Sequence, residues 1–179
     1  DAIFPMDAVL DSVGLRPGMT VADIGAGWGY MSFKLSKRVA PGGIVLAENI
    51  EQRWIDLLQS RAAARNLSNI KSILGRENDP LLPAAGVDMI FMHAVLQWIE
   101  NRPSYLRTLG TALKPDGRLV IIEPENEGDD HETGVQDAGK YPTRAGYLEL
   151  FRQAGFEVVS AEQKPGWRYP VFVLKKKAA

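Results

Sequence analysis

Short apolar runs alternate with amphipathic stretches along most of the chain. Residues 19–24, 44–47, 69–74, 87–92 and 118–122 are rich in aliphatic and β-branched side chains, which is typical of buried strands. Most of the stretches between these runs repeat apolar residues at helical spacing. The pattern therefore predicts successive strand and helix units, which form a mostly parallel sheet.

The apolar positions of the predicted helices recur mainly at steps of three and four residues. They are Met6, Val9, Leu10 and Val13 in a leading helix that stops at Gly14; Ile50, Trp54, Leu57, Leu58 and Ala62 in the third helix; and Tyr105, Leu106, Leu109 and Leu113 in the fourth. Residues 30–39 and 146–154 are predicted to form the second and fifth helices. Five helices are expected in all.

Glycine and proline mark the connections between these elements. Residues 75–86 read as a loop, and the Lys-Pro-Asp-Gly sequence at 114–117 reads as a turn before the fifth strand. Residues 156–160 and 169–174 are two further strands with a short connection. A parallel pair needs a crossover of about a dozen residues, so this pair is predicted to be an antiparallel hairpin.

Composition limits the classes of protein that fit. The 179 residues, 45% of them hydrophobic, suffice for one core, so residues 1–179 are predicted to form a single domain, with 1–18 as leading helix and entry loop. Lys and Arg number 21 against 22 Asp and Glu, and this balance disfavours nucleic acid and membrane surfaces as partners. With no cysteine and only two histidines, His93 and His131, no metal site is expected. We expect a cytoplasmic monomer or homodimer.

The strongest motif is the glycine turn between the first strand and the second helix. Its sequence, Asp23-Ile24-Gly25-Ala26-Gly27-Trp28-Gly29, gives Gly-x-Gly-x-Gly with an aspartate two residues before the first glycine. Glycines allow a tight turn and a close approach of ligand to backbone, next to free N–H groups at the helix start. Dinucleotide folds expect Gly-x-Gly-x-x-Gly instead, and position 30 is tyrosine.

This motif resembles that of the class I S-adenosylmethionine-dependent methyltransferases. The resemblance covers nearly the whole chain, including the leading helix, the turn within residues 113–119 and the closing strand pair. It implies a doubly wound seven-stranded α/β sheet of order 3-2-1-4-5-7-6, with helices on both faces. It also implies that Gly25, Ala26, Gly27 and Gly29 wrap the methionine part of S-adenosylmethionine, whose amino group Asp23 helps to hold.

In that family an acidic residue at the end of strand two binds the ribose hydroxyls. The alignment places this position on Asn49, with Glu48 directly before it. Adjacent strand residues point to opposite faces, so only one of the two is expected to reach the ribose. An amide offers one acceptor oxygen where a carboxylate offers two. The sequence leaves the choice between Glu48 and Asn49 open.

The family's third cofactor contact follows strand three, where an aspartate and its neighbours edge the adenine. Here Arg76 stands where many members carry aspartate, and Glu77 and Asn78 are the candidates to accept the adenine amino group. The alternative is a solvated loop without a ligand. The match at this position is partial.

His93 and Ala94 follow strand four, at the carboxyl edge where doubly wound folds place their ligands. The resemblance places this edge beside the methionine part and the reacting methyl group. His93 is therefore a candidate cofactor contact, a candidate general base on the acceptor, or a packing residue. Ala94 is a candidate cofactor contact.

Other residues are weaker candidates for an acceptor pocket, because aromatic side chains at such spacings are more often packing residues. They are Gln97, Trp98, Tyr141, Arg144, Trp167, Arg168 and Tyr169. The acidic stretch 123–132 is read as a solvated loop, with a lid or an attractor of cationic acceptors as alternatives.

The resemblance implies an enzyme that transfers a methyl group from S-adenosylmethionine to a small-molecule acceptor at O, N or C, leaving S-adenosylhomocysteine. Methyl transfer needs little from side chains beyond alignment of donor and acceptor, so the sequence does not identify the acceptor. Three alternatives remain: a nicotinamide oxidoreductase, a non-catalytic S-adenosylmethionine-binding module, and a protein methyltransferase.

Overall fold

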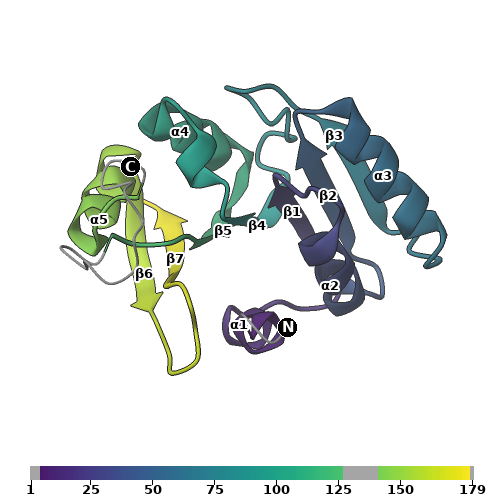
Figure 1. The fold of residues 1–179 in the computed structure, drawn as a ribbon, viewed down its shortest axis with the longest axis horizontal. Helices are drawn as coiled ribbons and strands as arrows, with labels where there is room; N and C mark the ends of the chain where they lie inside the picture. Colours follow the sequence, from purple (N-terminus) through teal and green to yellow (C-terminus); the bar gives the residue numbers. More distant parts are fainter. Residues whose placement is uncertain (1–4, 127–140, 178–179) are drawn as a thin grey trace.

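A computed structural model describes residues 5–126 and 141–177 of the chain. Its seven strands form one sheet of order β3-β2-β1-β4-β5-β7-β6 (Figure 1). The strands are β1 (Thr20–Ile24), β2 (Ile44–Asn49), β3 (Ile70–Leu74), β4 (Val87–His93), β5 (Leu113–Ile122), β6 (Phe156–Glu162) and β7 (Val171–Lys176). β7 pairs antiparallel with both β5 and β6, and the other neighbours pair in parallel. The predicted strand order and the closing hairpin are confirmed.

Two groups of helices cover the two faces of the sheet. The helices are α1 (Met6–Ser12), α2 (Tyr30–Val39), α3 (Gln52–Ala63), η1 (Leu96–Trp98), α4 (Arg102–Ala112) and α5 (Arg144–Gln153). α1 and α2 pack on the face that carries Val21, Val45 and Phe91, and α3 adds Leu58 against Ala47 on that side. α4 and α5 cover the opposite face. Alternate residues of each central strand thus meet different helices, because side chains along a strand alternate between faces.

Every residue of β4 from Met89 to Met92 is buried, as are all residues of β1 after Thr20. Such strands are covered on both faces, which explains why they read as continuous apolar runs. Within the described parts of the chain, no helix is both long and apolar enough to cross a membrane.

Two local predictions were wrong. The buried face of α3 consists of Ile55, Leu58 and Ala62, whereas Ile50 lies before the helix and is half exposed. The predicted stripe was therefore right at Leu58 and Ala62 but began too early at Ile50, and it missed the buried Ile55. Residues 114–117 are part of β5 rather than a separate turn, because Leu113 already pairs with Val87 before an irregularity in the β4–β5 register.

Candidate functional site

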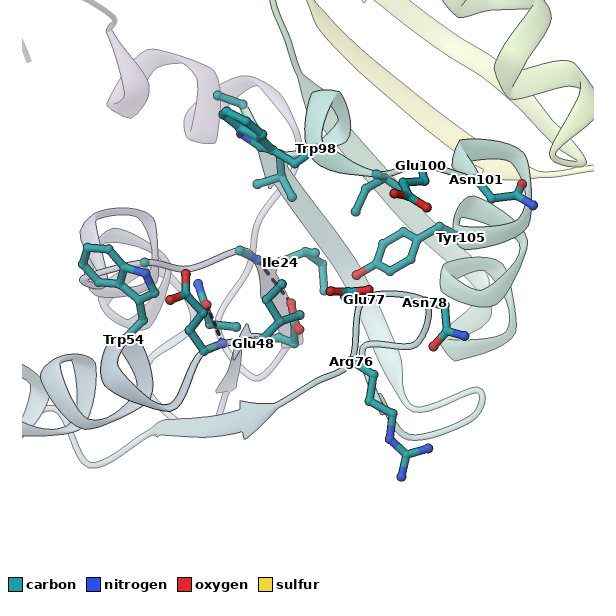
Figure 2. Close-up of a pocket in the computed structure, with 18 of the residues that line it drawn as sticks. Ile24, Glu48, Trp54, Arg76, Glu77, Asn78, Trp98, Glu100, Asn101 and Tyr105 are labelled. Atoms are coloured by element: carbon teal, nitrogen blue, oxygen red, sulfur yellow. Dashed lines mark hydrogen bonds between the residues drawn. The ribbon is translucent and has the colours of Figure 1, made fainter. Parts of the chain in front are cut away.

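A cavity of about 1140 Å³ lies at the carboxyl ends of β1, β2 and β4 (Figure 2). Doubly wound folds bind their ligands at this edge. The cavity brings together eight of the residues that the sequence predicted for the site: Gly25, Gly27, Glu48, Asn49, Glu77, Asn78, His93 and Ala94. Its wall also includes Trp54, Trp98, Ile99, Glu100 and Tyr105. Asp23, Ala26 and Gly29 do not line it.

The glycine turn leads from β1 into α2 and forms one wall of the cavity. Gly25 has φ 66°, and a Cβ built there would lie 2.6 Å from Val95 Cγ2, so the position requires glycine on both counts. Ala26 N–H donates to the Glu48 carbonyl oxygen at 2.8 Å, which ties the turn to β2. Gly29 precedes the first residue of α2, with φ 94°. The turn thus exposes backbone, rather than side chains, to the cavity.

Asp23 lies beneath the turn and does not face the cavity. Its Oδ2 accepts a hydrogen bond from Ser32 Oγ at 2.5 Å, and the residue is 2% exposed. Burial raises the pKa of Asp23 to about 7, although the hydrogen bonds from Ser32 oppose the rise. In this geometry the Asp23 carboxylate joins β1 to α2 through Ser32, and its contact with the cofactor amino group stays a prediction.

Glu48 and Asn49 both line the cavity, but their side chains are used differently. Asn49 Oδ1 accepts from Glu51 N–H at 3.1 Å, so the amide closes the turn that follows β2. Glu48 is 2% exposed, and its Oε2 accepts from Gly25 N–H at 3.3 Å. Glu48 Oε1 is buried without a hydrogen-bond partner. A buried oxygen without a partner costs free energy, and a ligand hydroxyl would relieve that cost.

The environment of Glu48 makes its carboxylate unusual. Burial raises its pKa to about 7, the Gly25 N–H opposes the rise, and the charge of Asp23 adds to it. Gly75 follows β3, the strand next to β2, and its lack of a side chain leaves the space into which the Glu48 carboxylate extends. A Cβ built at Gly75 would overlap Glu48 Oε1 and lie 2.8 Å from Cδ. The absence of a side chain at Gly75 therefore permits this position of Glu48.

The loop after β3 supplies Glu77 and Asn78 to the cavity wall, as the sequence predicted. The loop is closed by paired backbone hydrogen bonds between Arg76 and Asp79, with N–O distances of 2.7 and 3.2 Å. Asp79 Oδ1 also accepts from Leu81 N–H at 2.8 Å. Figure 2 shows the Arg76 side chain directed away from the cavity. The loop thus presents carboxylate and amide groups to the cavity and turns its guanidinium outward.

His93 and Ala94 lie where β4 ends at the cavity. Burial lowers the pKa of His93, so its imidazole is neutral near pH 7 and can accept a proton. Ala94 has φ 57°, an uncommon value for a residue with a Cβ, and its N–H donates to the Ile122 carbonyl at 2.9 Å. The strained turn directs the chain from β4 into η1, across the mouth of the cavity.

Glu123 has a role that the sequence did not reveal. The solvated-loop prediction was wrong for this residue, which is fully buried at the end of β5. Its Oε1 accepts from Val95 N–H and Leu96 N–H, both at 2.6 Å, while Oε2 has no partner. Burial raises the pKa of Glu123 to about 7, and the charge of Arg102 opposes the rise. The carboxylate holds the start of η1, and residues 127–132 of the acidic stretch lie outside the described residues.

The weaker acceptor candidates divide into two groups. Trp98 lines the cavity, whereas Gln97 lines a neighbouring hollow and its Nε2 donates to the Ala94 carbonyl at 3.1 Å. Arg144 instead pairs with Glu125, with Nε–Oε1 at 2.6 Å. Trp167 is 7% exposed within the core cluster that contains α1. The cavity is not lined by Tyr141, Arg168 or Tyr169.

The fold and the cavity define a class of protein. They describe a doubly wound α/β domain whose ligand lies across β1, β2 and β4, with backbone from a glycine turn on one side and a buried carboxylate ready for a hydroxyl on the other. A nucleoside attached to a small charged group fits this arrangement of donors and acceptors.

Comparison with known proteins identifies the family. Residues 15–164 match the family model described as a methyltransferase domain. A solved S-adenosylmethionine-dependent methyltransferase from Aquifex aeolicus is similar over 97% of this chain and 90% of its own, at 25% identity and a TM-score of 0.85. The chain belongs to the class I S-adenosylmethionine-dependent methyltransferase domains, and S-adenosylmethionine is the cofactor of this family.

Two curated relatives match a smaller part of the chain. Nocamycin O-methyltransferase of Saccharothrix syringae is 31% identical over 116 residues, which are 65% of this chain and 41% of the relative. The ubiquinone/menaquinone biosynthesis C-methyltransferase UbiE of Vibrio campbellii is 26% identical over 115 residues, which are 64% of this chain and 44% of the relative. The matched region spans less than half the length of each.

Proposed function

We propose that this protein transfers the methyl group of S-adenosylmethionine to a small-molecule acceptor at an oxygen, nitrogen or carbon atom. The observation that carries the proposal is the unpartnered Oε1 of Glu48, buried in the wall of a cavity at the carboxyl edge of the sheet. The similar O- and C-methyltransferases agree with this type of reaction.

The residues of the cavity fit the cofactor. Glu48 would accept hydrogen bonds from the ribose, because it has a free oxygen while Asn49 is occupied by Glu51 N–H. Gly25 and Gly27 would bring backbone against the methionine part, and Glu77 and Asn78 offer acceptors for the adenine amino group. Asp23 and Ala26 would support the turn from behind, and Gly29 would start α2.

When bound, the cofactor supplies an electrophilic methyl group on a sulfonium. The chain contributes alignment and exclusion of water, the main needs of such a displacement. His93, neutral near pH 7, is placed at the end of β4 to take a proton from an acceptor hydroxyl or amine. Ala94 would contact the cofactor through its backbone. The turn from Ala94 to Trp98, held by Glu123, would fix the wall between the two substrates.

The test separates methyl transfer from the alternatives. Calorimetric titration with S-adenosylmethionine and S-adenosylhomocysteine is expected to show binding, whereas NADH is expected to leave the melting temperature unchanged. Transfer of labelled methyl to a panel of small molecules supports the enzyme. Label found only on protein from a lysate would indicate a protein methyltransferase, and binding without any transfer would indicate a non-catalytic module. Absence of binding to both compounds would refute the proposal. A cytoplasmic location and a monomeric or homodimeric state stay predictions.

A further inference from the structure

We propose that the methyl acceptor is an uncharged or cationic molecule with an apolar ring or chain that lies against Trp98, and that anionic acceptors are rejected. The inference rests on the proposed function, since acceptor and cofactor must meet in the same cavity. Two separate features of the cavity carry it: an exposed aromatic wall and a lining in which carboxylates outnumber Lys and Arg side chains.

The aromatic wall is formed by the segment after β4. Trp98 is 70% exposed. No other exposed large hydrophobic residue in the described part of the chain has a higher exposed fraction. Trp98, Ile99 and Glu100 line the main cavity and also a second hollow of about 440 Å³. The second hollow adds apolar surface from Pro103, Pro142 and Leu150. Large apolar side chains exposed in a groove mark a place where an apolar ligand is bound.

Figure 2 places Trp98 on the side of the cavity opposite Arg76. The residues assigned to ribose and adenine, Glu48, Glu77 and Asn78, come from β2 and from the loop after β3. Trp98 is the last residue of η1, a short helix that begins two residues after Ala94. An acceptor that reaches the methyl group near His93 can therefore extend along Trp98 into the second hollow without displacing the nucleoside.

The charges of the lining are nearly all negative. Glu48, Glu51, Glu77 and Glu100 line the main cavity, and Arg76 is its one Lys or Arg lining residue within the described part of the chain. Arg76 points outward (Figure 2). Glu51 is paired with Arg53 at 2.7 Å, whereas Glu48 Oε1 has no hydrogen-bond partner. A bound anion would face these carboxylates, and no Lys or Arg side chain of the described lining is directed toward it (Figure 2).

The second hollow does contain one guanidinium, that of Arg102. Its Nε donates to the Leu96 carbonyl at 3.1 Å, and its charge acts on the buried Glu123. Arg102 is thus already compensated by a carboxylate of the fold. It does not provide a free positive site for an acceptor carboxylate or phosphate.

Three phenols of matched shape test the proposal: tyramine is cationic, 4-ethylphenol is uncharged and 4-hydroxyphenylacetate is anionic near pH 7. Their dissociation constants are measured by ligand-observed NMR on the full chain saturated with S-adenosylhomocysteine. Tyramine and 4-ethylphenol are expected to bind at least about tenfold more tightly than the anion. Trp98→Ala is expected to weaken both by roughly tenfold, because a stacked ring is lost. Val159→Ala, which trims an exposed side chain on β6, is the matched control and is expected to change nothing.

Each other result has a definite meaning. If 4-hydroxyphenylacetate binds as tightly as tyramine and 4-ethylphenol, or more tightly, the proposed rejection of anions is wrong. If Trp98→Ala binds tyramine and 4-ethylphenol as the original chain does, the proposed contact with Trp98 is wrong. If no phenol binds up to about 10 mM while S-adenosylhomocysteine does, the acceptor class is wrong and the proposed function stands. If S-adenosylhomocysteine itself fails to bind the folded chain, the proposed function fails instead. Glu100→Gln, which removes one charge without changing shape, is expected to narrow the difference between tyramine and the anion.

Discussion

Replacing Gly75 with alanine is expected to weaken cofactor binding through Glu48, although Gly75 itself lies outside the cavity wall. The added Cβ would overlap Glu48 Oε1 and lie 2.8 Å from Cδ and 3.1 Å from Cγ, so the carboxylate must move. The bond that holds it, from Gly25 N–H, is 3.3 Å long and therefore weak. Moving the carboxylate removes charged hydrogen bonds to the ribose, worth about 1.5–3 kcal/mol, or roughly 10- to 150-fold in affinity.

The measurement is calorimetric titration with S-adenosylhomocysteine at about pH 8, where Glu48 is ionised. Gly75→Ala, Glu48→Ala and the double variant are compared with the original chain. Because both changes act on one carboxylate, the double variant is expected to bind about as weakly as Glu48→Ala alone. Gly110→Ala is the control, since its Cβ would meet only Phe156 at an ordinary 3.4 Å and Gly110 does not line the cavity.

A role of Gly75 in positioning Glu48 is refuted if Gly75→Ala binds S-adenosylhomocysteine as the original chain does. It is also refuted if the two single losses simply add in the double variant, because Gly75 would then act elsewhere. Retained affinity in Glu48→Ala together with a loss in Asn49→Ala would move the ribose contact to Asn49. Circular-dichroism melting of each variant separates these outcomes from failure to fold.

Three further predictions follow from the buried groups. Glu123→Ala leaves Val95 N–H and Leu96 N–H without their acceptor, so the free energy of unfolding in urea is expected to fall by about 2 kcal/mol; undiminished stability, or unchanged hydrogen exchange at these two amides, would show that the carboxylate does not hold the turn. Burial raises the pKa values of Asp23, Glu48 and Glu123 to about 7, above those of the unfolded chain, so their stabilisation is complete below about pH 4 and is lost as the pH rises through 7. The lowered pKa of His93 has the opposite effect on stability, but it is one group against three. The melting temperature of the unliganded chain is therefore expected to be higher at about pH 5.5 than at about pH 8. A higher melting temperature at about pH 8 would show that burial does not raise the pKa values of these carboxyl groups. His93→Ala is expected to reduce turnover of an identified acceptor by about 100-fold or more while the affinity for S-adenosylhomocysteine changes little, and a loss of affinity alone would exclude a role as base.

The central strands were predictable because they are buried on both faces and read as apolar runs, whereas their order in the sheet was implied by the family resemblance. β1 and β4 are recognised from their aliphatic residues alone. The buried face of the third helix was harder to predict. Trp54 and Leu57 share the periodic spacing of the buried residues, but Trp54 lines the cavity and Leu57 is exposed. Helical spacing identifies a stripe and does not determine which of two neighbouring stripes meets the sheet.

The site was predictable where it depends on local sequence and not where it depends on contacts across the sheet. The glycine turn is a continuous motif, so Gly25 and Gly27 were found directly. The difference between Glu48 and Asn49 depends on Gly75, which follows the neighbouring strand β3, and on Glu51 N–H. The role of Glu123 depends on amides 27 and 28 residues earlier in the chain. The acidic residues that follow Glu123 in the sequence concealed its buried position.

The position of β7 has a consequence for synthesis of the chain. β7 is the last strand in sequence but lies between β5 and β6, and it is the only described strand that pairs with β6. Until residues 171–176 have left the ribosome, β5 keeps an open edge and the apolar side chains of β6 have no neighbouring strand. Open edges of this kind invite pairing with other chains. Chains that stall or are cleaved before Val171 are therefore expected to aggregate, because β5 and β6 then lack the strand that lies between them.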